Sequence, residues 1–171
     1  MDKGRLLRLL KHRLKDSGDL RRALTHDAVR RLEAHVRASE RRHSGEICVC
    51  VEAGLPLSYL WKGLPARKRA VTLFGKLRVW DTESNNGVLI YLLLAERAIE
   101  IVADRGLSRQ VPAEQWQAIV DSLGAALRAG NFEEGLSAAV DAVDALLLQH
   151  FPLAPGQANP NELPDAVLLL A

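Results

Sequence analysis

Two short apolar segments separated by a long amphipathic stretch constrain the fold of this chain most strongly. Residues 46–52 and 88–94 are rich in aliphatic side chains and are apolar on both of their faces. Such segments are typical of strands that are covered on both sides. Residues 59–79, between them, have apolar side chains at helical spacing and predict a crossover helix that is bent or begins near residues 63–65. Two buried strands joined in this way indicate an α/β fold.

The rest of the chain adds one strand and several helices. Ile99, Ile101 and Val102 follow the second apolar segment closely, which predicts a third strand paired with it as an antiparallel hairpin. Helical spacing marks four further segments, at residues 3–15, 25–42, 112–130 and 132–151. We therefore expect a small α/β/α sandwich with a mixed sheet of about three to four strands flanked by helices.

Composition and charge divide the chain into three parts. Apolar residues make up 48% and charged residues 26%, which is typical of a globular domain and not of a disordered chain. Residues 1–42 hold 13 of the 23 Lys and Arg residues and 6 of the 21 Asp and Glu residues, which gives +7 there and −5 elsewhere. We expect a basic amphipathic N-terminal helix within residues 1–24 and an α/β domain over 25–151. Residues 152–171 form a loose tail, although 166–171 are apolar enough to pack locally.

The basic helix is one candidate binding element. Its leucines lie at helical spacing among several cations, which suits either an anionic membrane surface or a partner protein. The alternative is a helix that docks on the domain and leaves its cations in water. A second group of cations follows in the crossover segment. The residues predicted for a partner or membrane surface are Arg5, Arg8, Lys11, Arg13, Arg67, Lys68 and Arg69.

The sequence disfavours nucleic acid as a partner. The basic stretches lack interleaved surface aromatics, and the aromatic residues that occur lie at spacings typical of a core, among them Trp61, Phe74 and Trp116.

The polar loop that enters the second strand is the other candidate site. If the second and third strands are antiparallel, residues 81–86 lie near Asp104 and Arg105, because the start of one strand meets the end of the other. Carboxylate and carbonyl oxygens are the ligands of Ca²⁺ and Mg²⁺, and Arg105 could bind a phosphate. The alternative is that Asn86 and Gly87 only turn the chain, and that Asp104 pairs with Arg105 or caps a helix. The predicted metal ligands are Asp81, Glu83, Asn85, Asn86 and Asp104.

Several segments together resemble the TPM domain family, which is widespread in bacteria. The segments are 85–91 (NNGVLIY) and 98–107 (AIEIVADRGL), supported by 27–51 upstream and 130–136 (GNFEEGL) downstream. The resemblance covers about residues 25–151, and the order of the segments is more specific than any one of them.

The resemblance implies a small α/β/α sandwich and two kinds of activity. Some members are described as acid phosphatases, and some bind divalent cations through loop acids near the first two segments. Many are tethered to membranes, and bacterial members often occur beside coiled-coil membrane proteins of the LemA family. This chain has Asn85 where common members have Asp, and Asp104 and Ser108 where they have Gly and Glu. Two acidic ligands are thus absent and one is gained.

Other chemistry has less support in the sequence. Cys48 and Cys50 lie two residues apart on one strand, a poor geometry for a disulfide, so we expect reduced core cysteines. No nucleophile with an adjacent base is visible. We therefore expect a non-enzymatic interaction module, cytoplasmic or peripheral at the inner face of a membrane, that docks on a LemA-type protein or an anionic membrane. The alternative is a weak acid phosphatase that depends on Ca²⁺ or Mg²⁺.

Overall fold

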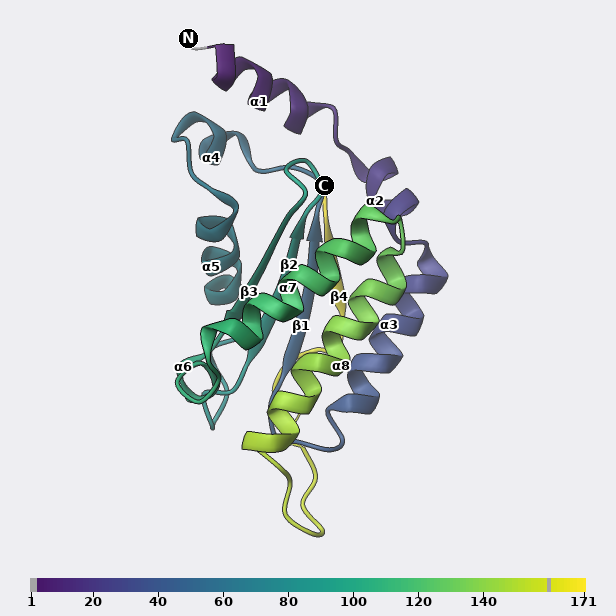
Figure 1. Cartoon of the computed structure of the whole chain (residues 1–171), viewed down its shortest axis with the longest axis vertical. Helices are drawn as coiled ribbons and strands as arrows, with labels where there is room; N and C mark the ends of the chain where they lie inside the picture. The colour runs from purple at the N-terminus through teal and green to yellow at the C-terminus, as the bar shows by residue number, and fades with distance from the viewer. Residues whose placement is uncertain (1–2, 160) are drawn as a thin grey trace.

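The computed structural model describes residues 3–159 and 161–171 (Figure 1). The strands are β1 (Ile47–Glu52), β2 (Val88–Leu93), β3 (Ala98–Ala103) and β4 (Val167–Leu170). The helices are α1 (Lys3–Arg13), α2 (Ser17–Ala23), α3 (His26–Ser39), α4 (Leu57–Trp61), α5 (Ala66–Lys76), α6 (Arg105–Ser108), α7 (Ala113–Arg128) and α8 (Phe132–His150).

The four strands form one mixed sheet in the order β3-β2-β1-β4. β1 is parallel to β2, with Ile47 opposite Val88, and it is also parallel to β4. β2 and β3 form the predicted antiparallel hairpin, in which Val88 lies opposite Ala103. The expected α/β sandwich with a sheet of three to four strands is confirmed.

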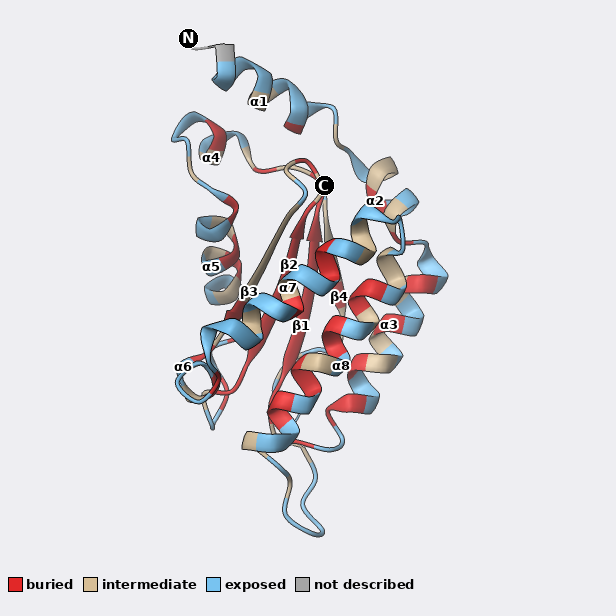
Figure 2. Ribbon diagram, in the orientation of Figure 1, coloured by how far each residue is buried: buried red, intermediate tan, exposed pale blue. Residues whose placement is uncertain are grey.

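Side chains alternate between two hydrophobic cores, one on each face of the sheet. Val49 and Ile90 contact the core under α3, α7 and α8, whereas Cys50 and Tyr91 contact the core under α4 and α5. Every residue of β1 and β2 is buried (Figure 2). The two apolar runs therefore have apolar side chains on both faces because helices cover both faces.

Capping explains where the first helices begin. Thr25 caps α3 by accepting a hydrogen bond from the Ala28 N–H. Asp16 begins α2, where its side chain and that of Asp19 form a capping box. The crossover segment forms two helices, α4 and α5, and the second begins after its N-cap residue Pro65, as one of the two alternatives expected.

The tail and one aromatic residue differ from the sequence-based expectation. Residues 166–171 were expected to pack locally within a loose tail, and residues 167–170 form a fourth strand whose apolar side chains contact both cores beside β1. Trp61 was expected in the core, but it is 65% exposed near the end of α4. Cys48 and Cys50 are buried and unpaired, as expected.

Two ends of the sheet carry the features that matter for function. α1 lies across the end where β1, β2 and β4 finish, and α6 lies at the opposite end (Figure 1). Within residues 3–159 and 161–171, no helix is both long and apolar enough to span a bilayer.

Candidate functional site

The loops before β2 and after β3 meet, as the hairpin predicts. The Asp104 N–H donates to the Gly87 carbonyl at 2.9 Å, and the Gly106 N–H donates to the Asn85 carbonyl at 2.9 Å. A side chain at Gly106 would overlap the carbonyl of Asn85, so glycine at this position allows the close approach of the two loops. The two loops therefore form one backbone-bonded cluster.

Two buried oxygens in this cluster have no hydrogen-bond partner. Asn86 is fully buried and donates from Nδ2 to Ser44 Oγ at 3.2 Å, but its Oδ1 accepts no hydrogen bond. Asp104 caps α6 by accepting from the Arg105 N–H at 2.6 Å, whereas its Oδ2 is unpaired. Buried oxygens normally have a hydrogen-bond partner, and a bound ion or water is one reason for an exception. The capping role expected as the alternative is present, and it leaves one carboxylate oxygen of Asp104 unused.

The other predicted ligands lie outside this buried pair. Asp81 is exposed, and its Oδ2 is 3.5 Å from Arg78 Nε. Glu83 is also exposed, and Asn85 adopts a left-handed backbone conformation in the turn. Arg105 extends into solvent. Among the described residues, no group of three or more His, Cys, Asp or Glu side chains could hold a metal ion.

The inward face of α1 combines polar contacts with one leucine, Leu9, which packs against the core under α4 and α5. Arg8 Nε donates to Glu96 Oε1 at 2.6 Å, and His12 Nε2 lies 2.9 Å from the same oxygen. The Leu55 N–H donates to His12 Nδ1 at 2.9 Å, so the imidazole proton lies on Nε2 and points to Glu96. Burial alone would raise the pKa of Glu96, but the hydrogen bonds from Arg8 and His12 lower it below its usual value. α1 is thus held to the domain by charged and polar contacts.

The outward face of α1 is apolar. Leu7 is 71% exposed and Leu14 is 78% exposed. Arg5 Nη2 donates to the Trp61 carbonyl at 2.6 Å, which places the exposed Trp61 of α4 next to α1. Figure 2 shows most of α1 exposed. We call this surface the leucine face, and its residues are Leu6, Leu7, Leu10, Leu14, Leu57 and Trp61.

Comparison with protein families identifies the chain. The family model described as the TPM domain matches residues 18–146. The chain belongs to the TPM domain family. α1 precedes the matched region, so the leucine face is built largely by an element outside the part of the chain that defines the TPM domain.

Solved structures agree with this assignment. The NMR structure of BA42 from the psychrophilic bacterium Bizionia argentinensis superposes with a TM-score of 0.74 at 25% identity, covering 85% of this chain and 94% of BA42. The solution structure of the N-terminal domain of a P. gingivalis protein gives a TM-score of 0.59 at 25% identity, covering 77% of this chain and 82% of that one. Comparison with curated proteins finds no match.

The predicted surface cations of this TPM domain fall into two groups. Lys11, Arg13 and Lys68 are exposed. Arg67 is also exposed, and its Nη1 donates to the Ile101 carbonyl at 2.6 Å. Within the described part of the chain, Arg13 makes no hydrogen bond or ion pair. Arg8, in contrast, holds α1 to Glu96 and does not belong to the free surface.

Arg69 also corrects the prediction, because it belongs to a buried cluster instead of the surface. Its Nη2 donates to Glu52 Oε1 at 2.6 Å, and the Tyr91 hydroxyl donates to Glu52 Oε2 at 2.6 Å. Burial and the bond to Glu52 raise the pKa of Tyr91. The sequence contained one signal for this cluster, which is Glu52 at the end of the otherwise apolar β1. A buried carboxylate is stable only with a charged or hydrogen-bonding partner, so a cation was to be expected nearby. Sequence reasoning missed this cluster.

Proposed function

We propose that this TPM domain is a non-enzymatic interaction module that docks on an anionic membrane surface through its leucine face. The observation that supports this most is the orientation of α1. An amphipathic helix that only packed on the domain would bury its leucines and leave its cations in water. α1 departs from this pattern, because Arg8 and His12 point inward and Leu9 is its one leucine packed on a core. Its other leucines, Leu6, Leu7 and Leu10, are exposed, as is Leu14 directly after the helix.

The composition of this surface suits the interface of a bilayer. Leucine and tryptophan side chains partition to the boundary between headgroups and acyl chains, and nearby cations are attracted to anionic lipids. Lys11 and Arg13 are exposed on α1, and Lys62 directly follows Trp61. A leucine that is fully buried gains about 1.5–3 kcal/mol, so even partial insertion of Leu6, Leu7, Leu10 and Leu14 would support reversible binding.

Vesicle flotation tests this proposal. We expect the full chain to float with phosphatidylglycerol vesicles and much less with phosphatidylcholine vesicles. The double variant Leu7→Ser with Leu14→Ser should bind phosphatidylglycerol at least about tenfold more weakly, because it removes two apolar contacts. Leu148→Ser is the matched control, since Leu148 is an exposed leucine of α8.

Two results would contradict membrane docking. One is equal flotation of the double variant and the wild type. The other is absence of vesicle binding together with leucine-dependent binding to a LemA-type coiled-coil protein, which would make a protein the partner of this face.

A second candidate function rests on Asn86 Oδ1 and Asp104 Oδ2, the unpaired buried oxygens of the loop cluster. They favour a divalent cation there, and with Arg105 nearby the cluster could act as a weak cation-dependent phosphomonoesterase. Thermal unfolding of the metal-stripped protein with Ca²⁺ or Mg²⁺ tests the cation. A cation at 100 times its Kd adds about 2.7 kcal/mol, a rise of several degrees in Tm.

Matched variants show whether the loop cluster binds that cation. Asp104→Asn keeps an oxygen for the α6 cap but loses the charge, so it should abolish the rise. Asp121→Asn, on exposed α7, should preserve it. If the rise is absent from the wild type, or equal in Asp104→Asn, the loop cluster is not a cation site.

A further inference from the structure

A cavity of about 480 Å³ lies at the carboxyl ends of β1 and β4, next to the last turn of α1. The chain leaves β1 through α4 and α5, which cover one face of the sheet. It reaches β4 after α8, which covers the other face. β1 and β4 are therefore neighbours at a switch point of the chain topology. In open α/β sheets, ligands bind outside the carboxyl ends of the strands at such a point. The loop cluster lies at the opposite end of the sheet.

The walls of the cavity combine apolar and cationic side chains. Leu55, Leu60 and Leu170 supply apolar surface, and Arg13, Lys15 and Arg69 supply cations. This composition differs from the loop cluster, which offers unpaired oxygens.

Glu52, the acidic lining residue, pairs with Arg69, so the charges of these two residues offset each other. Glu52 already accepts hydrogen bonds from Arg69 and the Tyr91 hydroxyl, so both of its oxygens are used. Arg69 donates to Glu52 from Nε and Nη2, and its Nη1 makes no hydrogen bond within the described residues. Lys15 Nζ donates to Asp19 Oδ1 at 2.9 Å. The Arg13 side chain, in contrast, has no hydrogen bond or ion pair in the described part of the chain. The unpaired positive charge at the cavity is thus that of Arg13, with Lys15 beside it in its pair with Asp19.

The position of α1 over the cavity is fixed. The Leu55 N–H bonds to His12 Nδ1, and the backbone of α1 approaches Gly54 so closely that a Cβ there would lie 2.8 Å from the His12 carbonyl oxygen. These contacts hold Arg13 and Lys15, which follow directly, at the edge of the cavity. The backbone that carries both cations is therefore held in place beside the cavity.

We propose that this cavity binds an anionic amphiphile, a molecule with a carboxylate or phosphate headgroup and an alkyl chain. The headgroup pairs with Arg13 and Lys15, and the alkyl chain lies against Leu55, Leu60 and Leu170. A volume near 480 Å³ is within the usual range for small-ligand sites, which are mostly apolar with a few placed polar groups. The site goes beyond membrane docking and does not depend on it.

Calorimetric titration of the full chain with short amphiphiles below their micellar concentrations tests the proposal. We expect saturable binding of decanoate or decyl phosphate, binding of decanol weaker by about tenfold or more, and none of inorganic phosphate. If decanoate binds more tightly than decyl phosphate, the natural ligand is a fatty acid. If decyl phosphate binds more tightly than decanoate, the natural ligand is a phospholipid. Equal affinity for decanol, or binding of inorganic phosphate as tight as decyl phosphate, would overturn the proposal.

Variants locate the binding. Arg13→Gln with Lys15→Gln should weaken the preferred amphiphile about tenfold and leave decanol unchanged, because only charge–charge pairing is lost. Arg21→Gln, an exposed arginine of α2 outside the cavity, is the matched control. Leu170→Trp, which fills the cavity, should abolish binding if circular dichroism shows that it folds.

A variant of the leucine face is the last control, because it separates membrane docking from binding in the cavity. The variant Leu7→Ser with Leu14→Ser should lose vesicle flotation and keep amphiphile binding, so failure of one proposal is distinguishable from failure of the other. If amphiphile binding is lost in that variant and survives Arg13→Gln with Lys15→Gln, the amphiphile binds on the leucine face and the cavity proposal is wrong.

Discussion

Single glycines set how closely the loop cluster can pack. Gly87 lies against the Val79 carbonyl and Gly106 against the Asn85 carbonyl, so a methyl group at either position would force the backbone apart. We expect Gly87→Ala to lower the free energy of unfolding by about 1–3 kcal/mol or more. Gly75→Ala is the control, because Gly75 is inside α5 with no atom near the added methyl group.

Urea unfolding measures both variants. Gly75→Ala should raise the free energy of unfolding by about 0.5–1 kcal/mol, as alanine does inside a helix. Equal stability of Gly87→Ala and the wild type would show that Gly87 does not lie against the Val79 carbonyl as described.

Glu40 is a buried carboxyl group that is protonated at neutral pH. Its Oε1 accepts from the Ile47 N–H at 2.8 Å, and its Oε2 is buried without a donor beside Asp165. Burial raises the pKa of Glu40 to about 9. A proton on Oε2 lets Glu40 donate to Asp165, which explains the missing partner. Burial also raises the pKa of Glu46, to about 7.

These raised pKa values make the folded state less stable as pH rises. The folded protein binds more protons than the unfolded chain above pH 4.5, so the stabilisation is complete below that pH and is lost through about pH 7 for Glu46 and about pH 9 for Glu40. In Glu40→Gln the amide NH₂ replaces the protonated Oε2. The variant should therefore show a smaller fall in Tm between pH 7 and 9, measured beside the exposed control Glu114→Gln. Parallel curves for Glu40→Gln and the wild type would contradict the protonated state.

At the scale of elements, the sequence predicted what depends on local pattern. The buried strands and the helices follow from apolar periodicity, and the meeting of Asn85 and Gly106 follows from the antiparallel hairpin. β4 was harder to predict from the sequence, because it is four residues long, follows a Pro- and Gly-rich segment, and pairs with a strand far away in sequence.

The orientation of α1 could not be predicted from its own residues. Amphipathic periodicity places the leucines inward, but the partners that turn Arg8 and His12 inward are Glu96 and the Leu55 N–H. Those partners lie in other segments of the chain. The same holds for the burial of Arg69, which depends on Glu52 at the end of β1.

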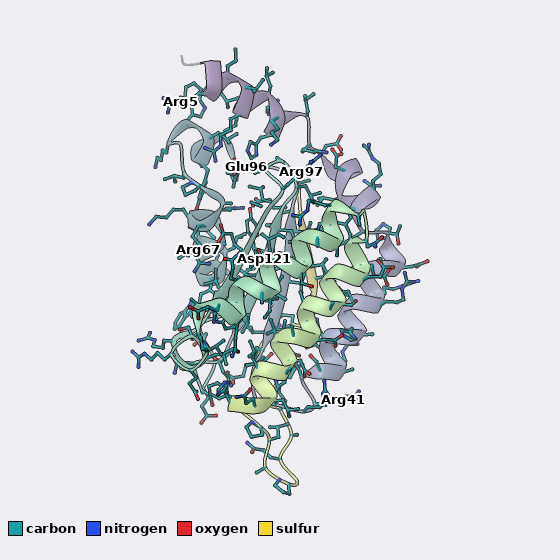
Figure 3. All side chains as sticks on the ribbon, in the orientation of Figure 1. Arg5, Arg41, Arg67, Glu96, Arg97 and Asp121 are labelled. Atoms are coloured by element: carbon teal, nitrogen blue, oxygen red, sulfur yellow. The ribbon has the colours of Figure 1, made fainter. Side chains whose placement is uncertain are left out.

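At the scale of the whole molecule, the two ends of the sheet have different chemistry. The end with α1 has the leucine face, exposed cations and the cavity, and the end with α6 has the loop cluster. Figure 3 shows Arg5 and Glu96 toward the α1 end, and Asp121 on α7 away from α1. The excess of positive charge in residues 1–42 is thus concentrated in part at the end proposed to face the membrane.

The most direct test of membrane docking is a fluorescent label on the leucine face. Leu7→Cys and, as control, Asp121→Cys would each carry an environment-sensitive dye, because the native Cys48 and Cys50 are buried. With phosphatidylglycerol vesicles, we predict a blue shift and protection from an aqueous quencher for the label at position 7 and no change at position 121. Vesicle binding without a change at position 7, or with the change at position 121 alone, would contradict docking through α1.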